Sequence, residues 1–91
     1  MQRRVRFRVS GRVQGVAYRA SAVDAAIHEG VVGWVRNLPS GDVDGVVQGE
    51  ATAVDGFLAW AARGPAGARV DRLTTIDEEV ADDLTRFEIR R

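Results

Sequence analysis

Two stretches of this sequence carry groups that suit the binding of a phosphoryl group. The first runs from Gly11 to Arg19 and reads Gly-Arg-Val-Gln-Gly-Val-Ala-Tyr-Arg. Gly11 and Gly15 allow the backbone to bend back on itself, so that successive N–H groups point to one place just before a helix begins. Free N–H groups at a helix N-terminus attract anions, and the planar guanidinium of Arg19 can bind two phosphate oxygens at once.

This stretch predicts a phosphate-binding loop that acts through its backbone. The residues expected to supply N–H groups are Gln14, Gly15, Val16, Ala17 and Tyr18, and Arg19 is the expected cation. A glycine-rich turn before a helix can also do no more than change the direction of the chain. The functional interpretation therefore depends on a second feature of the sequence.

That feature is the stretch Gly33-Trp34-Val35-Arg36-Asn37, which is followed closely by Ser40-Gly41. Asn37 lies where a predicted strand ends. Its amide group can hold a water molecule by hydrogen bonds, although it is not a strong base. Asn37 is therefore the second candidate catalytic residue, with the role of orienting an attacking water.

The residue types that are missing narrow the chemistry. The chain has no cysteine and one histidine, and all thirteen of its basic residues are arginine. Covalent and metal-assisted hydrolysis therefore both lack their usual groups, and no Walker lysine is present. A carboxylic–phosphoric anhydride needs none of these groups, because its leaving group is already good. Charge neutralisation and a positioned water suffice for it, so we expect no metal and no cofactor.

Hydrophobic periodicity predicts the elements that position these groups. Residues 4 to 10 alternate as a half-buried strand does, and a helix follows over residues 18–29, ending at Gly30. A second helix is expected to start with Thr52 as its N-cap and to stop at Gly64-Pro65. Further strands are expected over residues 31–36, 42–48, 70–76 and 85–90, the last of them short.

This order of elements predicts an α+β fold, a ferredoxin-like βαββαβ sandwich. Its sheet is expected to be antiparallel with four to five strands, and both helices are expected on one face. A right-handed crossover makes the first two strands parallel, with the third inserted between them. Both strands then end at the same sheet edge, about 9 to 10 Å apart, which brings Arg19 and Asn37 toward one site.

Composition limits the remaining possibilities. The length of 91 residues fits a single domain over residues 1–91, and a formal net charge of zero argues against a surface for polyanions. RNA binding, which this fold can support, lacks an aromatic platform on the third strand. No signal sequence or membrane-spanning run is apparent. We therefore expect a cytoplasmic monomer that binds neither nucleic acid nor membrane.

Several residues also have purely structural interpretations. Trp34 is expected to pack beneath the loop, Tyr18 to lie in the core or to form the wall of the site, and Arg36 to point to the opposite sheet face. The side chain of Gln14 is expected to be exposed on the loop and to have no role of its own. The early arginines and the acidic run of residues 77–79 are expected to be solvated.

The two stretches, Val13 to Arg19 and Gly33 to Asn37, resemble the two signature motifs of the acylphosphatase family in type, order and spacing. The resemblance extends over nearly the whole chain, through Gly64-Pro65 to Phe87-Glu88-Ile89. It implies hydrolysis of small acyl phosphates to carboxylate and phosphate without a metal. It also implies that Arg19 is the phosphate-binding arginine and Asn37 the asparagine that positions the water.

Three departures from the family pattern are mild. Ala17 stands where bulkier residues are usual, Tyr18 replaces the commoner phenylalanine, and Ser40 stands where aspartate is frequent. Ala17 could loosen the loop or the pocket for the acyl group. The alternative function is a non-catalytic regulatory module of the same fold that only binds an anion.

Overall fold

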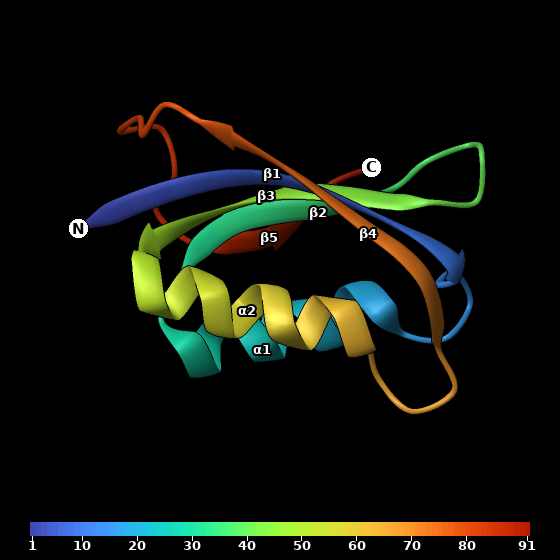
Figure 1. The fold of residues 1–91 in the computed structure, drawn as a ribbon. Helices are drawn as coiled ribbons and strands as arrows, with labels where there is room; N and C mark the ends of the chain where they lie inside the picture. The colour runs from blue at the N-terminus through green and yellow to red at the C-terminus, as the bar shows by residue number, and fades with distance from the viewer.

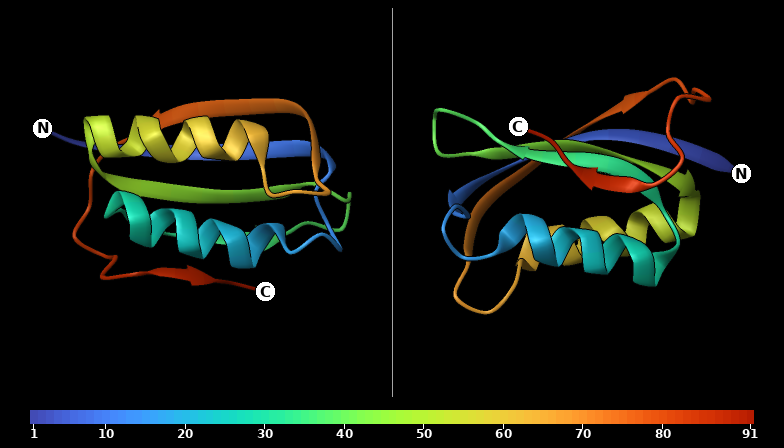
Figure 2. Two further views of the ribbon diagram at one scale, coloured as in Figure 1. Left: turned by 90° about the horizontal axis from the view of Figure 1, so that it is seen from below. Right: turned by 180° about the vertical axis from the view of Figure 1, so that it is seen from behind.

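The elements of the protein follow one another as the sequence predicts. The computed structural model describes residues 1–91 and contains β1 (Gln2–Arg12), α1 (Tyr18–Glu29), β2 (Val32–Asn37), β3 (Val43–Glu50), α2 (Ala51–Arg63), β4 (Arg69–Glu78) and β5 (Phe87–Ile89). The strands form one sheet in the order β4-β1-β3-β2-β5, and both helices cover the same face of it (Figures 1 and 2). The predicted ferredoxin-like arrangement is confirmed. No helix is long and apolar enough to cross a membrane.

The sheet is mixed, and the prediction of an antiparallel sheet is wrong for its last strand. β1 pairs antiparallel with β3 and β4, and β2 pairs antiparallel with β3, but β5 pairs parallel with β2. The reason is directional. β4 runs opposite to β2, so a chain that turns back after β4 and reaches the far edge of the sheet runs in the direction of β2.

The helices end as predicted, but α2 begins differently. Gly30 and Gly64 both have positive φ angles, of 77° and 71°, and close the two helices. The helix α2 starts at Ala51, one residue before the predicted N-cap Thr52, and no side chain caps it. Instead the Ala51 N–H donates to the carbonyl oxygen of Met1 at 2.9 Å. A tether to the chain terminus thus takes the place of the expected side-chain cap.

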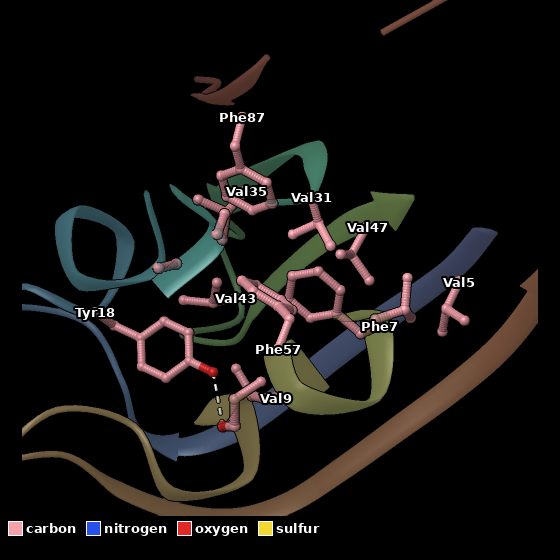
Figure 3. Close-up of a cluster of buried hydrophobic side chains, with 14 of the residues drawn as sticks. Val5, Phe7, Val9, Tyr18, Val31, Val35, Val43, Val47, Phe57 and Phe87 are labelled. Carbon is pink, nitrogen blue, oxygen red and sulfur yellow. Dashed lines mark hydrogen bonds between the residues drawn. The ribbon is translucent and has the colours of Figure 1, made fainter. Parts of the chain in front are cut away.

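The hydrophobic core fills the space between the sheet and the two helices (Figure 3). Tyr18, at the start of α1, is buried, and its hydroxyl donates to the carbonyl oxygen of Ala61 on α2 at 2.8 Å. Burial raises the pKa of this hydroxyl, so it stays protonated and remains a donor. Tyr18 therefore anchors the first turn of α1 to the core, directly behind the predicted phosphate-binding loop.

The opposite face of the sheet carries a second, smaller cluster around Trp34. The guanidinium groups of Arg6, Arg36 and Arg90 each lie 5.0 to 5.3 Å from the centre of its ring, and Asp44 accepts hydrogen bonds from Arg6 and Arg36. Trp34 is thus buried on this face, not beneath the loop as predicted. Arg36 points to this face as predicted, where its charge is paired with Asp44.

Candidate active site

The predicted phosphate-binding loop connects β1 to α1 and has the backbone of an anion nest. Gly15 has a φ angle of 74°, and Ala17, at the N-cap of α1, has φ 61° and ψ 28°. Ala17 is the one residue other than glycine with positive φ, a conformation that costs an L-residue about 1–2 kcal/mol. Strain at such a position is a feature of ligand-binding loops.

The N–H groups of this loop are free. No backbone N–H of residues 14 to 20 donates to another group of the protein, and the first that does is that of Ser21, which bonds to the Ala17 oxygen at 3.0 Å. These donors lie at the N-terminus of α1, where the helix dipole also favours a negative charge. The loop therefore offers an anion several unpaired N–H groups at once.

Arg19 and Asn37 line the same cavity as this loop. Arg19 lies in the first turn of α1 and forms no ion pair with the protein. Asn37 is the last residue of β2, where it pairs with Val43 of β3. The cavity has a volume of about 190 Å³ and is lined by Val13, Gln14, Gly15, Ala17, Tyr18, Arg19, Ala20, Asn37 and Ile89.

The side-chain amide of Asn37 has no partner in the protein. Its Oδ1 atom is buried and accepts no hydrogen bond, and it is the one buried side-chain polar atom for which this is so. A buried acceptor without a partner costs about 1–3 kcal/mol, so native proteins keep few of them. The amide is therefore free to hold a ligand or a water at this edge of the sheet.

Gln14 differs most from its predicted place. Its side chain is half-buried and its Nε2 donates to the carbonyl oxygens of Leu38 and Asp42, both at 2.9 Å. The prediction that this side chain is exposed and only decorates the loop is therefore wrong. Both acceptors lie in the connection between β2 and β3, directly after Asn37.

Of the predicted loop residues, Val16 is the one that does not line the cavity, because its side chain packs against the core. The sequence analysis missed Val13, Ala20 and Ile89, which form apolar parts of the wall. The sequence predicted the last strand but did not reveal that β5 pairs beside β2. That pairing brings Ile89 to the edge where Asn37 lies.

Three larger hollows lie elsewhere on the molecule. One, of about 300 Å³, is on the open sheet face beside Arg6 and Asp44. Another, of about 230 Å³, lies beside Arg8 and Arg72. The third, of about 470 Å³, lies on the outer side of the helices and includes Trp60. None of them holds the loop N–H groups or an unpaired buried amide, so the cavity at Arg19 and Asn37 is the candidate active site.

Comparison with known proteins identifies the family. The acylphosphatase family model matches residues 5–89. The chain belongs to the acylphosphatase family. It is 49% identical over 89 residues to the acylphosphatase of Methylococcus capsulatus, a match that covers 98% of this chain and 97% of that protein. It is 52% identical over 87 residues to the acylphosphatase of Anaeromyxobacter dehalogenans, covering 96% of this chain and 94% of that one.

A solved structure agrees with this assignment. The acylphosphatase from Coxiella burnetii superposes with a TM-score of 0.91 at 34% identity, over 98% of this chain and 93% of that chain. This chain is accordingly an acylphosphatase, a hydrolase of acyl phosphates. The family resemblance noted in the sequence and the enzyme class that it implies are both confirmed.

Proposed function

We propose that Arg19 and the N–H groups of residues 14 to 19 hold the phosphoryl group of a small acyl phosphate, while Asn37 orients the attacking water. The phosphoryl group carries close to two negative charges at neutral pH, and the free N–H groups and the unpaired guanidinium match that charge. The N–H groups are fixed by the backbone of the loop and the first turn of α1 before substrate arrives. They therefore stabilise the charge that develops on the phosphoryl oxygens without reorganisation.

The observation that carries this proposal is that Asn37, whose Oδ1 has no partner in the protein, lines the same cavity as Arg19 and the loop. A water that donates to this oxygen has its own lone pair directed away from the amide, toward the bound phosphorus. The water oxygen bonds to phosphorus as the bond to the carboxylate oxygen breaks, and the carboxylate leaves with the electron pair. The two protons of the water end on phosphate oxygens or pass to solvent.

No residue in the wall is a strong base, so the water attacks without prior deprotonation. That is adequate because the carboxylate is a good leaving group and phosphoryl transfer proceeds through a loose transition state. The apolar part of the wall, which includes Ala17 and Ile89, faces the acyl group in this proposal. We also propose that the reaction requires no metal or cofactor.

We propose further that one copy of the chain, acting as a single domain, is sufficient for activity. The loop, Arg19 and Asn37 of a single copy line one cavity, so the proposed site needs no group from a second copy. A cytoplasmic location is part of this proposal and is supported by the absence of cysteine from the sequence. Specific activity that does not change on dilution would support the monomer.

The test is hydrolysis of benzoyl phosphate by the wild-type protein and by Arg19→Ala, both with a strong chelator present. We expect wild-type turnover to persist under chelation. In Arg19→Ala, turnover and inhibition by inorganic phosphate should be lost together, because one group serves both the bound state and the transition state. Loss of wild-type turnover under chelation would contradict the metal-free reaction. A folded wild type that binds phosphate but hydrolyses nothing would support the regulatory module instead.

A further inference from the structure

We infer that Gln14 is a positioning residue, whose side-chain amide fixes the phosphate-binding loop relative to Asn37. The inference rests on the proposed function, because it concerns the distance between the bound phosphoryl group and the oriented water. It extends that function by giving a role to a side chain that touches neither of the two. Gln14 belongs to the loop, and the groups that it binds belong to the opposite side of the site.

The contacts are specific for an amide. Both hydrogens of Gln14 Nε2 are used, one on the Leu38 oxygen and one on the Asp42 oxygen, each at 2.9 Å and partly shielded from water. A carboxylate has no hydrogen to donate to these oxygens, and a hydroxyl has only one. Leu38 follows Asn37 directly in the chain. The amide therefore connects the phosphate-binding loop to the peptide unit beside the residue that orients the water.

The turn that receives these bonds is closed without Gln14. Leu38 N–H donates to the Asp42 oxygen at 2.8 Å, and Gly41 N–H donates to the Leu38 oxygen at 3.1 Å. The two carbonyl groups therefore already have backbone partners, and the turn does not need the glutamine in order to form. Gln14 adds a hydrogen-bonded link between the phosphate-binding loop, which follows β1, and the turn between β2 and β3.

The spacing between the two loops matters because of the reaction. The attacking oxygen and the phosphorus must lie about 3–3.5 Å apart and in line with the leaving oxygen, and a displacement of 1 Å can cost about a hundredfold in rate. Arg19 and the loop N–H groups belong to one continuous segment, the loop and the first turn of α1. Loss of the Gln14 hydrogen bonds should therefore misplace this segment relative to Asn37 more than it weakens phosphate binding by the segment itself.

A second glutamine provides a matched control. Gln48 is buried, and its side chain donates to the Ala81 oxygen at 2.8 Å, accepts from the Ala81 N–H at 3.2 Å and accepts from Arg4 at 3.3 Å. It pairs with Val32, at the end of β2 that lies away from Asn37. Replacing Gln48 by methionine removes three hydrogen bonds, where the same change at Gln14 removes two, but it does so at the other end of the sheet.

The experiment compares Gln14→Met and Gln48→Met, each made in the wild type and in Asn37→Ala. Methionine keeps the length of the side chain and removes its donors without adding charge. Benzoyl phosphate kinetics give kcat and KM, inhibition by inorganic phosphate gives the affinity of the loop, and urea unfolding gives the stability of every variant. In Gln14→Glu the side chain keeps its shape but has no hydrogen to donate. The kcat of this variant at saturating substrate provides a second test.

We expect Gln14→Met to lower kcat about 10- to 100-fold, while the inhibition constant for phosphate changes by less than about threefold. In the Asn37→Ala background the same change should lower kcat by less than about threefold, because the water is no longer held there. Gln48→Met should lower stability and leave kcat unchanged. Gln14→Glu should lower kcat as Gln14→Met does.

Two outcomes would overturn the inference while the proposed function stands. One is an unchanged kcat in Gln14→Met and Gln14→Glu. The other is a loss of kcat by the same factor in the wild type and in Asn37→Ala, which would mean that Gln14 acts on the fold and not through Asn37. If Asn37→Ala by itself kept its turnover, the proposed function would fail, and the inference would fail with it.

Discussion

Replacing Asn37 by alanine should lower turnover without lowering stability. The Oδ1 atom of Asn37 is buried without a partner, which costs the folded state about 1–3 kcal/mol. Alanine removes this cost together with some packing of a half-buried side chain. We therefore expect the free energy of unfolding to stay the same or to rise by about 1 kcal/mol. We expect kcat to fall about 10²- to 10³-fold, the scale for one lost hydrogen bond in a transition state.

Urea unfolding and benzoyl phosphate hydrolysis, measured on the same preparation, test this prediction. Inhibition by inorganic phosphate should be nearly the same in the variant and the wild type, because Arg19 and the loop are untouched. A variant that is destabilised by more than about 1 kcal/mol but keeps its kcat would refute the reasoning. The buried amide would then be a structural group whose partner lies in the folded protein itself.

Three other substitutions test separate parts of the account. Ala17→Gly should raise the free energy of unfolding by about 0.5–1 kcal/mol, as measured by urea unfolding. Glycine relieves the left-handed conformation at φ 61°, and this gain exceeds the cost of the added entropy of the unfolded chain. The kcat of this variant should stay close to that of the wild type. Burial opposes the charged form of Asp44, but hydrogen bonds from Arg36 and Arg6 outweigh burial and hold the pKa of Asp44 below its ordinary value of 3.8. A lowered pKa stabilises the folded state above the ordinary value, and this contribution is lost as the pH falls below it. Asp44→Asn should therefore be less stable than the wild type at pH 7, and it should lose less stability than the wild type between pH 5 and pH 2. Urea midpoints measured across this range test the prediction. Equal losses in the two proteins would contradict the stabilisation of the folded state by the Asp44 carboxylate. Ile89→Ala should raise the KM for benzoyl phosphate several-fold and leave the KM for acetyl phosphate nearly unchanged. The substitution removes an apolar part of the cavity wall that only the larger acyl group reaches. Equal effects on the two substrates would mean that Ile89 does not contact the acyl group.

The topology and the proximity of Arg19 and Asn37 could be predicted because they depend on local pattern. Alternation marks β1, the helical stripe and Gly30 mark α1, and a short turn joins β2 to β3. Once the crossover is taken as right-handed, β1 and β2 must end at the same edge. This reasoning brings Arg19 and Asn37 together without any knowledge of side-chain contacts, and both do line one cavity.

The role of Gln14 could not be predicted in this way. Its two acceptors lie 24 and 28 residues further along the chain, in a turn that only the folded sheet brings to the loop. The sequence contains no local signal for such a bond, because a glutamine in a loop is polar and compatible with water. The parallel pairing of β5 and the position of Ile89 also could not be predicted, because the sequence contains no local signal for contacts between distant segments.

The misplacement of Trp34 has a different origin. Alternation along β2 puts Trp34 on the same face of the sheet as Arg36, which was predicted to point to the face opposite Asn37. The prediction that Trp34 packs beneath the loop did not apply this alternation and was wrong. Three arginines cover the ring on the open face, where the attraction of each cation for the ring replaces a second layer of apolar side chains.

The most direct measurement is a titration with inorganic phosphate followed by the backbone amide signals of the wild type, Asn37→Ala and Arg19→Ala. We expect the amide signals of residues 14 to 20 to shift most in the wild type and in Asn37→Ala, with similar phosphate affinity, and not to shift in Arg19→Ala. Shifts that were instead centred on the arginines around Trp34 would place the anion site on the open face of the sheet. That result would contradict the assignment of this loop as the phosphate-binding element.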